Sequence, residues 1–238
     1  MISENDIISR VEESYASHPG YRHKFWDWFA AGGFDLPLLQ KFALLYYEHV
    51  KIFRLYLAGA MTVMPSEDLQ IALAEIIGDE FGIAAHEPSE PAASHPELFR
   101  QFMRSIGLTE NEWEGNRPIR GIKHFRDVHY ALFRGELVDE TLGAITFGCE
   151  RTTPFRHGKV VSGVRKFMQS QSIPVNVTFF SAHQEIDPHH SGSLIAAMSR
   201  LSKNGSLSIE RVIAGARMSF DARKVFLDDL AKSLGIQL

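Results

Sequence analysis

The segment HQEIDPHH carries side chains whose types and spacing suit metal binding. Its residues His183, Asp187 and His190 are spaced at i, i+4 and i+7, so on an α-helix they lie along one face. Two imidazoles and one carboxylate on a single stripe form a donor set for a divalent cation. The same stripe would also suit the solvated surface of an ordinary helix, so the segment alone does not decide between the two.

Three other ionisable residues lie on helix faces that are otherwise apolar. Glu80 extends the apolar stripe of DLQIALAEIIGDEFG, Glu150 stands in the apolar segment LGAITFGCERTTPF, and His95 begins the amphipathic segment HPELFRQFM. A buried ionised carboxylate is costly unless it is paired or bound to a metal. Each residue taken alone is more often structural than a ligand, but together they extend the donor set of the first segment.

The combined set holds three carboxylates and three imidazoles on four predicted helices, which is the ligand count of a dinuclear site in a helical bundle. Two divalent ions would more than neutralise the three carboxylates and leave room for an anionic ligand. Nitrogen and oxygen donors without a thiolate favour iron or manganese over a structural zinc ion.

The elements that must position these residues are predicted to be helices, because the apolar residues follow a helical period along nearly the whole sequence. The pattern predicts an all-α protein with seven or eight helices in a single domain over residues 1–238, and VNVTFF is its only β-like run. Asp35 and Ser66 are predicted helix caps, and a kink is expected near Pro154. The longest predicted helices cover residues 38–64, 67–82, 94–106, 139–168 and 208–234.

Composition excludes several classes of function. The net charge of −4 and the pI of about 6.3 give no footprint for nucleic acid. No apolar run approaches the ~18 residues of a membrane span, and the polar start of the chain is unlike a signal peptide, so we expect a cytoplasmic location and no membrane partner. The single cysteine, Cys149, cannot form an internal disulfide and is predicted to be a small buried hydrophobe.

Four segments of the chain resemble the heme-oxygenase-like diiron oxidases and oxygenases. They are LLQKFALLYYEHVKIF, then DEFG followed by a loop and HPELF, then GCERTTPF, and finally HQEIDPHH, which is the most specific. The segments occur in the family's order and span roughly residues 20–200.

The resemblance implies a seven-helix bundle like that of heme oxygenase, related to the folds of thiaminase II and pyrroloquinoline-quinone synthase. It implies an enzyme that activates the cosubstrate O2 through a peroxo-diiron intermediate, with one ion often bound loosely, and oxidises a small metabolite that carries an amine or a carboxylate. The two iron ions, or manganese in their place, would be bound by Glu80, His95, Glu150, His183, Asp187 and His190.

One ligand position is left open in the long loop between Glu80 and His95. His86 stands in that loop and would be an alternative ligand. We favour His95 because it begins an amphipathic segment, whereas His86 lies among proline and glutamate residues.

Pro188 leaves a second position open. Proline removes a helical N–H group, so Asp187 could instead cap a new helix with Pro188 in its first turn. In that interpretation His189 rather than His190 would point inward.

Several other residues are predicted either to line a substrate pocket or to lie at the solvated surface. A substrate pocket is predicted from aromatic residues that could equally be core: Tyr46, Tyr47, Phe147 and Phe180. Phe179 is a further candidate for the wall of the metal cavity. Solvated surface positions are predicted for Glu48, His124, His129 and His157.

Three other functions remain as alternatives. The first is a metal-free enzyme on the same fold, either a cofactor-free oxidase of the pyrroloquinoline-quinone-synthase type or a thiamine-degrading enzyme. The thiamine-degrading enzyme is disfavoured because the only cysteine, Cys149, lies mid-helix beside Glu150. The second is heme binding through one histidine, which the many carboxylates disfavour. The third is a non-enzymatic interaction protein on the same fold. A homodimer is left open.

Overall fold

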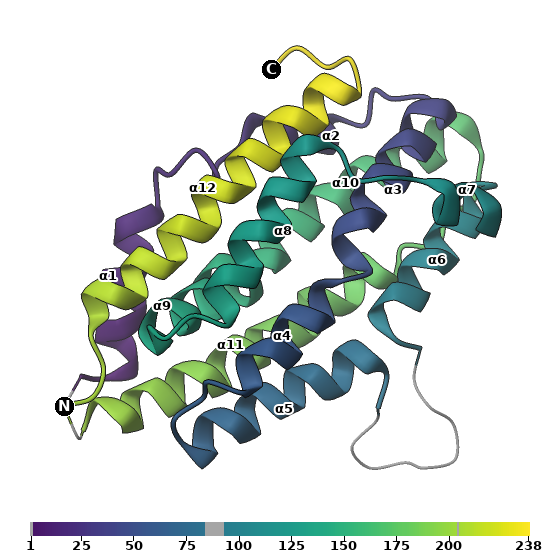
Figure 1. Ribbon diagram of the computed structural model, residues 1–238. Helices are drawn as coiled ribbons and strands as arrows, with labels where there is room; N and C mark the ends of the chain where they lie inside the picture. Colours follow the sequence, from purple (N-terminus) through teal and green to yellow (C-terminus); the bar gives the residue numbers. More distant parts are fainter. Residues whose placement is uncertain (1, 84–92, 204) are drawn as a thin grey trace.

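The structure, a computed structural model, describes residues 2–83, 93–203 and 205–238, and all regular elements in these ranges are helices (Figure 1). The predicted all-α class is confirmed. The β-like run VNVTFF forms no strand, and its last three residues begin a long helix. The helices are α1 (Glu4–Tyr15), α2 (Lys24–Ala31), α3 (Leu36–Val50), α4 (Phe53–Met61), α5 (Glu67–Phe81), α6 (His95–Ser105), α7 (Glu110–Gly115), α8 (Arg120–Phe133), α9 (Val138–Gly143), the π-helix η1 (Ala144–Cys149), the 3₁₀-helix η2 (Glu150–Thr152), α10 (Thr153–Gln171), α11 (Thr178–Ser202) and α12 (Ile209–Ser233).

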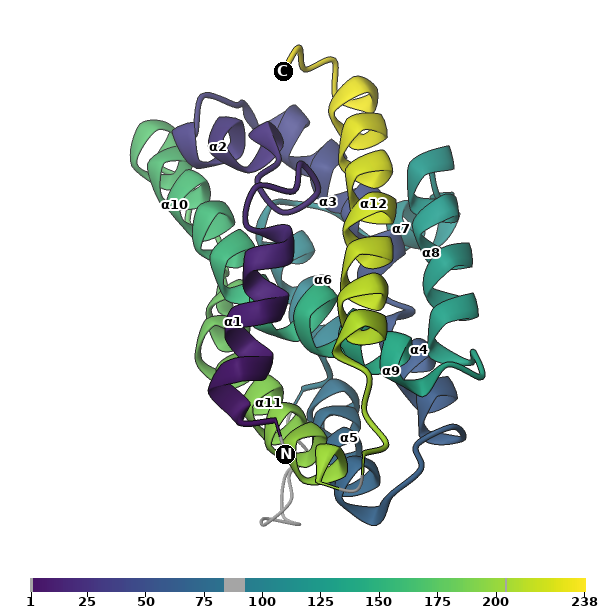
Figure 2. The same cartoon turned by 90° about the vertical axis from the view of Figure 1, so that its left-hand side faces the viewer.

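The long helices α10, α11 and α12 organise the bundle. Helix α12 packs against α8, α9 and α1, and α11 packs against α10 and α5 (Figures 1 and 2). The two ends of the chain lie at opposite ends of the bundle in both views. Close approach of α9 to α12 requires glycine, because a Cβ atom on Gly143 would lie 1.9 Å from the carbonyl oxygen of Val212.

The predicted caps explain where several helices begin and end. The Asp35 side chain accepts a hydrogen bond from the N–H of Leu38 at 2.9 Å, and Ser66 accepts one from the N–H of Leu69. Helix α5 ends at Gly82, whose φ of 73° is in the left-handed region that favours glycine. This end fixes the last turn of α5, which carries Glu80.

The helix predicted over residues 38–64 is broken between α3 and α4. In a continuous helix the carbonyl of Glu48 would accept the N–H of Ile52. Here Arg126 of α8 donates to that carbonyl instead, and Ile52 bonds to the carbonyl of His49 at 3.5 Å. A side chain from a distant helix therefore ends α3, which sequence periodicity cannot foresee.

The helix predicted from residue 139 is also irregular, and the irregularity precedes Pro154. The chain passes from α9 into the π-helix η1 and the 3₁₀-helix η2 before α10 begins at Thr153. Pro154 lies in the first turn of α10, where a missing N–H group is tolerated. π-helical turns are often found at functional sites, and Glu150 directly follows this one.

No helix in the described ranges is long and apolar enough to cross a membrane.

Candidate metal centre

Six buried side chains form two groups that could each hold a metal ion. We call Glu80, His95 and His183 the first triad, and Glu150, Asp187 and His190 the second triad. Within each triad, one donor atom of every residue lies within 4.8 Å of the others. The structure thus brings together all six residues that the sequence predicts as ligands, and their role as ligands stays a prediction.

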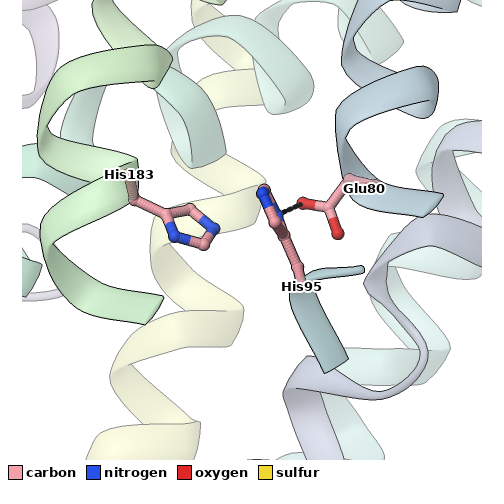
Figure 3. A group of neighbouring side chains, drawn as sticks. All are labelled: Glu80, His95 and His183. Atoms are coloured by element: carbon pink, nitrogen blue, oxygen red, sulfur yellow. Dashed lines mark ion pairs between the residues drawn. The ribbon is translucent and has the colours of Figure 1, made fainter. Parts of the chain in front are cut away.

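The first triad joins three helices (Figure 3). Glu80 comes from the last turn of α5, His95 is the first residue of α6, and His183 lies on α11. His95 Nδ1 lies 2.8 Å from Glu80 Oε1 but lacks the alignment of a hydrogen bond. The two atoms form an ion pair when His95 is protonated (Figure 3), and a cation bound by both would take the place of that proton.

His183 is oriented for metal binding by the backbone of its own helix. Its Nδ1 atom donates to the carbonyl oxygen of Phe179 at 2.6 Å, which leaves Nε2 as the donor toward the triad. Its ring centroid lies 4.2 Å from that of His95.

The second triad is supplied mainly by α11. Asp187 and His190 lie one turn apart on that helix, and Glu150 comes from η2. The Nδ1 atom of His190 lies 3.3 Å from Glu150 Oε2 and 4.0 Å from Asp187 Oδ1. Its Nε2 atom lies 2.8 Å from Asp79 Oδ2, so Asp79 is an outer partner that orients the ring.

Helix α11 continues through Pro188, which decides between the two interpretations of this segment. Asp187 lies inside the helix and is not its cap. His190 is buried, whereas His189 is exposed to solvent. The other alternative ligand, His86, lies outside the described residues.

The carboxylates of the two triads crowd one another. Burial, and then the charges of Glu150 and Glu80, raise the pKa of Asp187 well above its usual value. Bound cations would relieve this repulsion, because they favour the ionised carboxylates. The absence of a thiolate among six nitrogen and oxygen donors suits iron or manganese.

The three histidines of the triads differ in how readily they are protonated. Burial, reinforced by the nearby His95, holds the pKa of His183 well below its ordinary range. Burial alone would also lower the pKa of His95 and of His190, but the neighbouring carboxylates, Glu80 and Glu150 respectively, raise both. Burial therefore favours the neutral form of His183, which can bind a metal, whereas the carboxylates favour the protonated form of the other two rings.

A cavity of about 50 Å³ adjoins both triads. It lies where the two apolar cores meet, since Tyr46 and Phe179 belong to one core and Cys149 to the other. Five of the six triad residues, all except His190, line this cavity. The rest of its lining consists of Tyr46, His49, Val50, Phe53, Cys149, Thr153, Arg156, His157, Phe179 and Arg223.

The family model described as "iron-containing redox enzyme" matches residues 40–224, which include all six triad residues. The chain belongs to this family. The resemblance seen in the sequence motifs is thereby confirmed.

This chain has distant curated relatives, and each match covers most of both chains. It is 23% identical to the 4-aminobenzoate synthase of Chlamydia muridarum over 87% of this chain and 82% of the relative. It is 26% identical to the 4-aminobenzoate synthase of Chlamydia pneumoniae over 89% of both chains. It is also 23% identical to the 4-chloro-allylglycine synthase of Streptantibioticus cattleyicolor, over 77% of this chain and 66% of the relative.

Solved structures confirm the heme-oxygenase-like fold. A CADD-like protein of unknown function from Nostoc punctiforme superposes with a TM-score of 0.76 at 17% identity, covering 96% of this chain and 97% of that one. A TenA homologue from Pseudomonas syringae gives 0.74 at 12% identity, covering 97% and 96%. A domain with a heme oxygenase-like fold from Shewanella denitrificans gives 0.63 at 15% identity, covering 96% and 90%.

Only part of the predicted substrate pocket lies at the cavity of this family member. Tyr46 lines it, but the described lining does not include Tyr47, Phe147 or Phe180. The Tyr47 hydroxyl accepts from Arg100 at 2.9 Å, and the other two are core residues. Of the neighbouring candidates Phe179 and Phe180 on α11, Phe179 is the one that lines the cavity.

Two of the three histidines predicted at the surface are buried, so those predictions are wrong. His129 bonds to the carbonyl of Phe125 at 2.8 Å and to the hydroxyl of Ser219 at 2.9 Å. His157 lines the cavity, while His124 is exposed as predicted. The missed signal for His157 is its spacing of seven residues from Glu150, which places both on one side of the helix.

Glu48 is buried as well, contrary to the surface position predicted for it. Its carboxylate pairs with Lys51 at 2.7 Å and with Arg126 at 3.1 Å. The second partner comes from α8, so no local pattern could reveal it.

Arg223 and Asp79 are two further residues that sequence reasoning missed. Arg223 interrupts the apolar stripe of α12 between Phe220 and Phe226, which is the same signal that singled out Glu80. Asp79 gave no such signal, because its side chain is 44% exposed and only the fold brings it to His190.

Proposed function

We propose that this protein is an O2-dependent diiron oxidase or oxygenase that acts on a small metabolite bearing an amine or a carboxylate group. The observation that carries the proposal is the convergence of two buried triads, each with carboxylate and imidazole donors within 4.8 Å. Membership in the iron-containing redox enzyme family supports iron as the metal.

The products named for the relatives belong to the proposed chemical class. The names 4-aminobenzoate and 4-chloro-allylglycine both denote compounds with an amino group and a carboxylate. We extend only this chemical class to the present chain.

Two bound ferrous ions would supply the electrons that reduce O2. The chain's own residues bind and shield the reacting groups. Tyr46 and Phe179 give the cavity an aromatic wall that excludes water. Phe179 and Asp79 hold the rings of His183 and His190 in fixed orientations through the 2.6 Å and 2.8 Å hydrogen bonds.

The thiaminase-like alternative requires a reactive thiol, and Cys149 does not supply one. Burial raises the pKa of this thiol to about 11, so it stays protonated and weakly nucleophilic at neutral pH. It is also the one cysteine in the sequence.

Anaerobic loading with Fe(II) tests the proposal. We expect two irons per chain by metal analysis, followed by a transient visible absorption band when O2 is admitted. A chain that takes up no iron, yet consumes O2 with an organic substrate, would instead be a cofactor-free oxidase. A chain that does neither would favour the interaction-protein alternative.

A further inference from the structure

Two arginine side chains are buried at the cavity without a carboxylate partner in the described part of the chain. Arg156 of α10 is 3% exposed and Arg223 of α12 is 1% exposed, and both line the cavity beside the triads. A buried guanidinium normally pairs with an anion, because the loss of hydration is costly. The feature therefore needs a compensating partner.

The groups that Arg156 contacts are neutral. It donates to the hydroxyls of Thr152 and Thr153, the latter at 2.6 Å, and to the carbonyl of Cys149 at 3.4 Å. Its Nε atom is buried and has no hydrogen-bond partner among the described residues. These contacts satisfy N–H groups but do not balance the charge. Burial and Arg223 lower the pKa of Arg156 more than Asp187, which lines the same cavity, raises it, and no salt bridge joins Asp187 to Arg156 among the described residues.

The buried positive charge of Arg223 has even fewer compensating contacts than that of Arg156. It donates to the carbonyl of Gly148 at 3.1 Å, and its guanidinium lies 4.9 Å from the ring centroid of Phe125. Its Nε atom is likewise buried and unpartnered. The two arginines also oppose each other, since burial and then the charge of Arg223 lower the pKa of Arg156 to about 9.

Two histidines add neutral donors to the same cavity. The Nδ1 atoms of His49 and His157 are buried without a hydrogen-bond partner among the described residues. Burial holds the pKa of each well below its usual value, so both rings are uncharged. Four cavity-lining residues thus offer unpartnered nitrogen atoms, and two of them bring positive charge.

A purely structural role accounts for only part of this arrangement. The carbonyls of Gly148 and Cys149 lie at the end of the π-helix, where the regular bonding pattern changes, and the arginines help to satisfy them. A neutral donor would serve that purpose without the cost of a buried charge.

We propose that Arg156 and Arg223 bind the carboxylate of the substrate, and that its apolar body packs against Tyr46 and Phe179. The inference rests on the proposed function and narrows its substrate class to organic acids whose anionic end enters beside the arginines. Planar guanidinium groups suit this ligand, because they match a carboxylate with paired hydrogen bonds. A cationic amine would be repelled at the same position.

Isothermal titration with benzoate and propionate, each compared with its amide, tests the proposal on the full chain. Each amide matches the shape of its acid but lacks the charge. We expect wild-type protein to bind the acids about 10-fold more tightly than the amides. Arg223→Gln and Arg156→Gln should each weaken acid binding about 10- to 100-fold and leave amide binding unchanged.

The control variant is Arg217→Gln, which changes an exposed arginine two turns earlier on α12. It should bind both acids as wild type does. Far-ultraviolet circular dichroism confirms that each variant is folded. If neither arginine variant folds, the comparison of acid with amide on wild-type protein decides, and equal affinities overturn the proposal.

Each titration is done with metal-free and with Mn(II)-loaded protein, which separates this inference from the proposed function. Acid binding that requires the metal and survives both arginine substitutions would place the carboxylate on the metal and overturn the inference. Acid binding that depends on the arginines, in a chain that takes up neither Mn(II) nor Fe(II), would support the inference and refute the diiron function. If neither the metal-free nor the Mn(II)-loaded protein binds the acids, the inference is refuted.

Discussion

The two triads use similar donors but are built differently. The second triad takes two of its three residues from one helix, α11, and its histidine has an outer carboxylate partner in Asp79. The first triad takes one residue from each of three helices, and His95 stands at the start of α6, where Ser94 makes no side-chain capping bond. The comparison teaches that the second triad is preorganised by a single rigid element, whereas the first depends on three helices meeting.

Deleting one histidine from each triad should give the largest effect. We expect His95→Ala and His190→Ala each to reduce iron from two ions per chain to one, because each triad loses a third of its donors. Metal analysis after anaerobic Fe(II) loading measures this, and circular dichroism should show nearly unchanged helicity. His183→Ala should behave as His95→Ala does. The exposed His124 provides the control, as His124→Ala should retain both ions, and full iron content in the triad variants would refute the ligand assignment.

Asp79→Asn should weaken the second triad alone. Loss of an outer carboxylate partner typically reduces metal affinity about 10- to 100-fold. Competition with a chelator would measure the two metal affinities, and in Asp79→Asn one of them should fall while the other stays as in wild type. Equal weakening of both ions would show that Asp79 acts on the whole centre. The matched control is Asp68→Asn, an exposed change in the first turn of the same helix.

Acidification should release metal more steeply from the second triad. The pKa values of Asp187 and His190 are both raised, so the metal-free second triad holds protons that a cation must displace. In the first triad the pKa of His95 is raised but that of His183 is lowered, so fewer protons compete. Affinity should fall about tenfold per pH unit for each displaced proton. Titrating His95→Ala and His190→Ala, which each retain one triad, between pH 8 and 6 measures the two slopes, and equal slopes would contradict the comparison.

His129 provides a reference outside both triads. Burial lowers its pKa to about 3 in the folded protein, against about 6.5 when unfolded. The unfolded chain therefore binds more protons between these values, and stability should fall as the pH falls below about 6.5, by up to ~1.4 kcal/mol per pH unit. Urea unfolding of metal-free protein at pH 7 and pH 5 measures this. His129→Asn should reduce the dependence, whereas the exposed change His124→Asn should not. Part of the dependence should remain, because the pKa values of His49 and His157 are also lowered by burial.

The sequence predicts the helical class and the inward position of the six triad residues because both depend on local periodicity. Glu80 stands out in its apolar stripe, and the residues of α11 share one face whatever the rest of the chain does. Contacts between helices that are far apart in the sequence cannot be predicted from local periodicity. The end of α3 depends on Arg126, and the burial of Glu48 depends on the same side chain.

Other features could have been read from the sequence by the rule that found Glu80. Arg223 and His157 both interrupt buried faces of their helices, yet a basic residue is easily taken for solvated surface. The π-helix before Glu150 gave no signal in the sequence. It differs from an α-helix in its backbone hydrogen bonds, which its apolar side chains do not reveal.

Consecutive residues of α5 serve the two triads, since Glu80 belongs to the first and Asp79 holds His190 of the second. A shift in the last turn of this helix cannot adjust one without the other. If both triads bind a cation as proposed, the two affinities would therefore be linked thermodynamically. Filling one triad would alter the affinity of the other, and the reverse effect would have the same magnitude.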